Sequence, residues 1–243
     1  MHSPYTSNTF FHFVGHKHPN DHEANFEVLL KVLRIGCVSH PPHEESWGKV
    51  SHRICWESSL LEEKLIVPTV TCYADIPFDS LGVHIKKYGK FGVSFPRELL
   101  IRYGARPVIY IPLHKDDWGS PNGVTLLRDI EATYKGFYET LVSSSLSADK
   151  PARRSLGRKP QNISEAIHAV NSTLAKDFLA FIKPFNSHLE EDHPDNYYME
   201  REWRKHGNLK FTPHDIENIV VAKDYSLRLE MELPQYKGKI LEI

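Results

Sequence analysis

The sequence predicts a single-domain α+β fold, and three observations support this class. Segments rich in aromatic and β-branched residues, which favour strands, occur near the start of the chain and again close to its end. Two long segments with helical periodicity lie between them. The expected strands are clustered and do not alternate strictly with long helices, which favours α+β over a doubly wound α/β fold.

The first strand is expected at residues 9–14, "TFFHFV". Alternation along a strand places Phe11 and Phe13 on one face and His12 on the other. A helix at 24–36 follows, since its apolar residues recur at helical spacing and it ends at a glycine. The other elements expected in the first half are buried strands within 64–78, a short helix at 79–89, a strand at 90–95, a helix at 96–104 and a strand at 106–113.

The second half begins with a long helix at residues 123–147. A basic segment at 150–159 then breaks all periodicity, and its Pro, Ser and Gly content predicts a mobile loop at about 145–163. We expect this loop to separate helices rather than domains. The remaining expected elements are an amphipathic helix at 163–185 and strands at 209–211, 216–225 and 226–233.

The composition is that of an ordinary soluble protein. Hydrophobic residues make up 40% and charged residues 25% of the 243 positions, and the formal net charge is −1. This charge gives no support for a nucleic-acid or membrane partner, and no apolar run approaches the roughly 20 residues of a membrane span. The start of the chain lacks a secretory pattern, and the three cysteines fit reduced thiols. The sequence therefore predicts a cytoplasmic protein.

The 15 histidines raise the question of a metal site. They gather in "HKHPNDH" (residues 16–22) and "HPPH" (residues 40–43), both in loop-like sequence. Neither group has cysteine pairs at the spacing of structural zinc sites, and no HExxH motif occurs. We therefore expect solvent-exposed histidines and no metal site.

The segment "YYMEREWRKHG", residues 197–207, carries two acids two positions apart. On a helix Glu200 and Glu202 would point to different sides, whereas on a strand they would share one face. Glu, Arg and Met favour a helix, but the tyrosines, the tryptophan and the turn-like flanks favour a strand. The extended interpretation is preferred, and it places Tyr198, Glu200, Glu202 and Arg204 on one face.

Two neighbouring carboxylates suit a particular chemistry. They repel each other, so a cation such as Arg204 can help to keep both ionised. An ionised carboxylate stabilises the positive charge that develops on a sugar carbon during glycosidic cleavage. The alternative is a surface lattice of ion pairs, which contributes little and has no catalytic role.

Five segments point to a family: "FHFVG", "FEVLLKVLRIG", "TCYADIPFDSLGVHIKKYGKFGVSF", "GARPVIYIP" and "YYMEREWR". Together they resemble the AbiGi family of abortive phage-resistance proteins, over most of the chain apart from residues 145–163. That family carries the label of antitoxin, the protective half of a toxin–antitoxin pair, and the resemblance therefore implies a partner toxin.

A looser resemblance connects the early "HF" strand, the helix after it and the late E-x-E strand to ADP-ribosyltransferase-like proteins. It implies a mixed, split β-sheet flanked by helices that clasps NAD. By this resemblance His12 hydrogen-bonds the dinucleotide. Glu202 would bond the nicotinamide ribose and stabilise the transition state, and Glu200 would orient or deprotonate the acceptor.

The same resemblance assigns the remaining contacts with NAD. Tyr73 or Tyr88 would stack on the nicotinamide ring, and Arg204 completes the residues expected at the dinucleotide. The segment "TCYADIP" lacks the serine-rich signature of the arginine-specific branch, so the macromolecular acceptor of ADP-ribose stays undefined.

Three functions remain open from the sequence. The leading hypothesis is a phage-defence enzyme that cleaves the nicotinamide–ribose bond of NAD, as an ADP-ribosyltransferase or an NAD glycohydrolase. The alternative is a non-catalytic antitoxin that binds and neutralises a partner toxin. The third is a nuclease using histidine and the paired acids, and the neutral charge and missing metal spacing count against it.

Overall fold

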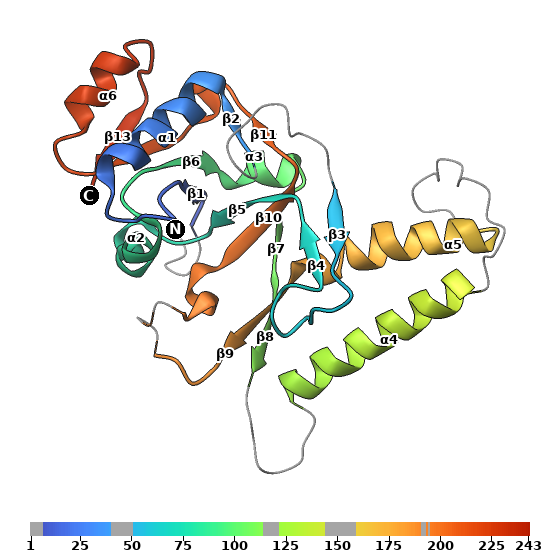
Figure 1. Cartoon of the computed structure of the whole chain (residues 1–243). Coiled ribbons are helices and arrows are strands. Elements are labelled where there is room, and N and C mark those ends of the chain that lie inside the picture. Colours follow the sequence, from blue (N-terminus) through green and yellow to red (C-terminus); the bar gives the residue numbers. More distant parts are fainter. Residues whose placement is uncertain (1–6, 40–50, 114–121, 144–158, 191–192, 194) are drawn as a thin grey trace. The chain divides into compact units, whose positions relative to one another are not determined.

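A computed structural model describes residues 7–39, 51–113, 122–143, 159–190, 193 and 195–243 (Figure 1). The chain divides into two compact units, and each is described here by itself. The first unit consists of residues 1–50, 69–108 and 189–243, and the second of residues 51–68 and 109–188. The expected α+β class is confirmed, whereas the single domain stays a prediction.

A seven-stranded sheet forms the centre of the first unit, in the order β13-β12-β6-β1-β5-β10-β7. Its strands are antiparallel to their neighbours, except that β12 and β13 run parallel, so the sheet is mixed as expected. The strands are β1 (Thr9–Phe13), β5 (Val70–Ala74), β6 (Gly92–Pro96), β7 (Arg106–Pro107), β10 (Glu202–His206), β12 (Asn218–Val221) and β13 (Lys239–Glu242). A separate pair in this unit joins β2 (Cys37–Val38) and β11 (Leu209–Lys210).

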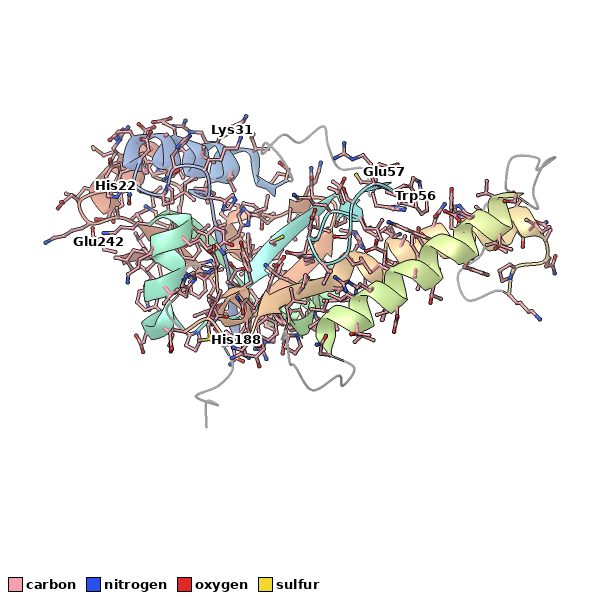
Figure 2. All side chains as sticks on the ribbon, turned by 60° about the horizontal axis from the view of Figure 1, so that its bottom comes forward. His22, Lys31, Trp56, Glu57, His188 and Glu242 are labelled. Atoms are coloured by element: carbon pink, nitrogen blue, oxygen red, sulfur yellow. The ribbon has the colours of Figure 1, made fainter. Side chains whose placement is uncertain are left out.

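Three helices pack on one side of this sheet, here called the first face, which buries Phe10, Val93 and Ile219. Apolar residues of all three helices share the two cores on this side. The helices are α1 (His22–Ile35), α3 (Arg97–Arg102) and α6 (Ser226–Glu232). α1, whose residues His22 and Lys31 are labelled in Figure 2, ends at Gly36 as expected, and this glycine has a left-handed backbone with φ of 65°.

The opposite side of the sheet, here called the second face, buries Phe11, Phe13 and Val220. Leu81, directly before α2 (Gly82–Tyr88), and Ile85 within this helix pack against these residues. In Figure 1, α2 and the pair α1 and α6 lie on opposite sides of the sheet. The described part of the unit also contains the 3-10 helices η2 (Phe78–Ser80), η5 (Tyr197–Glu200) and η6 (Pro213–Asp215).

The second unit has its own core of buried apolar residues, which includes Leu65, Leu127 and Phe181. Trp56, labelled in Figure 2, extends this core, because its ring stacks on Tyr134 at 5.8 Å. β3 pairs antiparallel with β4, and β8 pairs parallel with β9. The elements are β3 (His52–Ile54), β4 (Ile66–Pro68), β8 (Ile109–Leu113), α4 (Gly123–Ser143), α5 (Ile163–Ala169), a π-helix η3 (Val170–Ala175), a 3-10 helix η4 (Leu179–Phe181) and β9 (Ile182–Asn186).

Three of the expected elements need correction. Residues 226–232 form a helix instead of a strand, because Leu229 and Leu233, four residues apart, are buried together while Leu227 and Met231 are exposed. The helix expected at 163–185 is α5 followed by η3, η4 and strand β9. The strand expected at 106–113 divides into β7 and β8. Most of the basic loop expected at 145–163 lies outside the described residues.

Candidate functional site

The segment around the paired acids is extended only from Glu202 onwards. Tyr197–Glu200 forms the 3-10 helix η5, and Arg201 follows with a left-handed backbone, φ 45°. A left-handed residue interrupts the pleat of a strand, so β10 begins directly after it. The strand predicted through Tyr198 and Glu200 is therefore wrong for those two residues and confirmed for Glu202 and Arg204.

Glu200 is buried, and one of its oxygens is bonded by two groups of α2. One of its carboxylate oxygens, Oε1, accepts hydrogen bonds from Lys87 Nζ at 2.6 Å and from the Tyr88 hydroxyl at 2.7 Å. Lys87 Nζ also lies 3.7 Å from the centre of the Tyr197 ring. These contacts fasten η5 onto α2 with a charge-assisted hydrogen bond and a cation–π contact.

Glu202 is also buried and forms an ion pair with a different residue, Arg204. Its Oε1 accepts a hydrogen bond from Arg204 Nε at 2.7 Å, within the same strand. Glu202 lies opposite Ala74 of β5, and Ala74 lies opposite Phe11 of β1. Because directly opposite residues of a sheet point to one side, Glu202 and Arg204 lie on the second face with Phe11.

Tyr88 lies close to both carboxylates. Burial raises the pKa of its hydroxyl, and the negative charges of Glu200 and Glu202 raise this pKa further. The hydroxyl therefore stays protonated at neutral pH and serves as a hydrogen-bond donor to Glu200. The arrangement holds two acids, two cations and one phenol on the second face.

His12 and Tyr73 lie on the first face. His12 lies opposite Val93, and its ring centre is 5.8 Å from that of Tyr73, which packs in the same core as Phe10 and Val93. The His12 Nδ1 atom is 2.9 Å from the carbonyl oxygen of Cys72, so the tautomer that protonates Nδ1 donates a hydrogen bond there. Burial lowers the pKa of the His12 imidazole, which keeps the ring neutral.

The six residues expected at one site thus fall into two sets on opposite sides of the sheet. Glu200, Glu202, Arg204 and Tyr88 gather on the second face, and the other two are on the first. The structure therefore does not bring His12 and Tyr73 into a cleft with the acids. The roles assigned to the six residues toward NAD stay predictions.

The buried imidazole predicts how the stability of the first unit depends on pH. The unfolded chain binds a proton at His12 below about pH 6.5, while the folded protein resists protonation because the pKa is lowered. The contribution of His12 to the free energy of unfolding should be fully present above pH 6.5. It should fall as the pH drops, by at most about 1.4 kcal/mol per pH unit.

Hydrogen exchange of the β1 and β5 amides between pH 5 and pH 8 measures this slope. His12→Phe, which cannot titrate, should show a shallower decline of stability in acid than the wild type. Equal slopes in the two proteins would show that His12 does not carry the effect.

A cavity of about 230 Å³ opens beside Glu200, between α2 and η5. Its apolar wall is formed by Ile76, Pro77, Val83 and Met199. Its ionisable lining residues are His84, Lys87, Glu200 and Arg201.

A second carboxylate centre was not expected from the sequence. The position of Asp75 before Pro77 predicts a turn cap, but its side chain is 5% exposed and pairs with arginines. Arg97 Nη2 lies 3.0 Å from both carboxylate oxygens, and Arg201 Nη2 lies 3.4 Å from Oδ2. Sequence reasoning missed this centre because the two arginines are 22 and 126 residues away from Asp75. The sequence signal that could have found it is an acid at the end of an apolar strand.

Comparison with known proteins identifies the family to which the chain belongs. The family described as "Putative abortive phage resistance protein AbiGi, antitoxin" matches residues 49–240. The chain belongs to the AbiGi family. No curated protein and no solved structure matches the chain.

The match places the second-face residues of this AbiGi protein inside the family region. Tyr88, Glu200, Glu202 and Arg204 lie within residues 49–240, whereas His12 lies before it. The part of the chain shared with the family therefore contains the acids, their cations and the cavity, and leaves out strand β1.

Within the described ranges, no three or more His, Cys, Asp or Glu side chains gather in a way that could hold a metal ion. Among those same residues, every helix is too short or too polar to cross a bilayer.

Proposed function

We propose that this protein is a phage-defence antitoxin, which restrains a partner toxin by binding it and catalyses no reaction. The observation that supports the proposal is the AbiGi match over residues 49–240, because that family is described as an abortive phage resistance protein and antitoxin. An antitoxin of this kind needs a stable folded surface and no reactive centre.

The geometry of the paired acids supports binding rather than catalysis. A catalytic carboxylate has to reach its substrate, but Glu200 is bonded to Lys87 and Tyr88 and Glu202 is bonded to Arg204. His12, expected to hold the dinucleotide, points to the other side of the sheet. Internal pairing of this kind suits a structural role for the two acids.

Co-expression with the product of the adjacent gene tests the antitoxin function. Expression of that gene alone should arrest growth, and co-expression of this protein should restore it, with the two proteins co-purifying as a complex. Growth arrest that persists despite equal amounts of both folded proteins would contradict the proposal.

NAD cleavage on an ADP-ribosyltransferase-like fold is the second candidate. One observation favours it: Glu200 and Glu202 are buried beside the same tyrosine on the second face. In this alternative NAD is the substrate, and a macromolecule or water accepts ADP-ribose.

Incubation of the purified protein with NAD separates the two candidates. We expect no nicotinamide release above a blank, either from the wild type or from Glu202→Gln, because both acids are neutralised internally. Release by the wild type that Glu202→Gln abolishes would overturn the binding proposal and support the enzyme.

A further inference from the structure

The cavity beside η5 combines features of a protein-docking site. It is small, at about 230 Å³, compared with the roughly 300–1,000 Å³ of sites for drug-sized ligands. Its volume suits one inserted side chain. The apolar wall of Ile76, Pro77, Val83 and Met199 suits an aliphatic or aromatic group.

Large apolar side chains are exposed at the cavity's edge. Met199 lines the cavity, Tyr198 is next to it on η5, and Phe78 follows the lining residue Pro77. All three are among the exposed large hydrophobic residues of the first unit. An exposed apolar patch around a small pocket is the usual anatomy of a site where a partner inserts an anchoring side chain.

The charges at the cavity indicate which charged group of a partner would lie beside the inserted side chain. The Arg201 side chain is 41% exposed, although its Nη2 atom also lies 3.4 Å from Asp75. Glu200, the one acid among the described lining residues, is 10% exposed and already accepts two hydrogen bonds. Lys86 is exposed on α2, and the nearby exposed acids Asp79 and Asp195 do not line the cavity. The accessible charge in the cavity wall is therefore positive, which complements a carboxylate of the partner.

We propose that a segment of the partner toxin docks on η5 and α2, inserting one aliphatic or aromatic side chain into the cavity and setting a carboxylate against Arg201. This inference rests on the proposed antitoxin function and identifies the surface through which it acts. The docked surface comprises Phe78, Tyr198, Met199 and Arg201.

Paired substitutions test the docking surface against matched positions of the same unit. Tyr198 and Tyr103 are 51% and 49% exposed, and Met199 and Met231 are both exposed methionines, with Tyr103 and Met231 outside the cavity lining. The affinity of each purified variant for the adjacent gene's product is measured by calorimetry, after confirming that its melting temperature matches the wild type.

Tyr198→Ala and Met199→Glu should each weaken binding about 30-fold, as expected for anchor positions at an interface. Arg201→Gln should weaken it at least tenfold, because it removes the charge and keeps the reach of the side chain. Tyr103→Ala and Met231→Glu should bind like the wild type. Binding should also slow the exchange of the η5 amides.

The outcomes separate this inference from the proposed function. Wild-type binding with no loss in Tyr198→Ala, Met199→Glu and Arg201→Gln overturns the docking surface and leaves the antitoxin function intact. Absence of wild-type binding overturns both. Loss of self-association or of RNA binding in Met199→Glu, with toxin binding retained, also overturns the inference, because the surface would then serve another partner.

Discussion

Replacing Arg97 with leucine is expected to lower the free energy of unfolding of the first unit by about 3–5 kcal/mol. Asp75, the partner of Arg97, is 5% exposed, and Arg97 Nη2 lies 3.0 Å from both of its oxygens. Without Arg97 the carboxylate keeps, among the described residues, the backbone N–H of Ser7 at 3.1 Å and the more distant Arg201 at 3.4 Å. A buried charge that loses its nearest counter-ion retains its desolvation penalty with much less compensation.

Arg102→Leu is the matched control, because Arg102 is exposed on the same helix, α3. Its effect should stay within about 0.5 kcal/mol. The double variant Asp75→Asn/Arg97→Leu should be more stable than Arg97→Leu alone, since the unpaired charge is then absent. Hydrogen exchange of the β5 amides measures all three, and equal losses at positions 97 and 102 would rule out a role for the ion pair.

Much of the fold could be predicted because its signals are local. The helix at 24–36 was expected from apolar spacing and from Gly36, and α1 ends at that glycine in the structure. The helix at 96–104 agrees with α3 for the same kind of reason. The helix α6 could not be predicted in this way, because the apolar residues from Leu227 to Leu233 alternate as in a strand. Only the packing of Leu229 against the first face decides between the two.

The candidate site could be predicted only in part, because its geometry depends on pairing between distant segments. The Glu202–Arg204 pair follows a short-range pattern, since the two residues are two positions apart on one strand. The side on which His12 lies relative to Glu202 depends on the register that aligns Phe11 with Ala74 and Ala74 with Glu202. A shift of one residue would reverse that relation, and no local signal fixes it.

The second large loss of stability is expected on replacing Lys87, because its side chain joins η5 to α2. Its ammonium group lies 2.6 Å from Glu200 Oε1 and 3.7 Å from the centre of the Tyr197 ring, and it lines the cavity together with Met199. Lys87→Leu should lower the free energy of unfolding of the first unit by about 3 kcal/mol, because the buried carboxylate of Glu200 loses the cation that lies 2.6 Å from its Oε1 atom. The amides of η5 should exchange faster than in the wild type.

The neighbouring Lys86 provides the control for this prediction, because it is exposed on the same helix and lines no part of the cavity. Lys86→Leu should change stability by less than about 0.5 kcal/mol. Glu200→Gln in the Lys87→Leu background should recover part of the loss, since a neutral amide can still accept from the Tyr88 hydroxyl. Faster exchange confined to η5 and α2 would show that this ion pair holds the toxin-docking surface in shape. Unchanged exchange there would contradict a role of the Lys87–Glu200 pair in holding η5 in place.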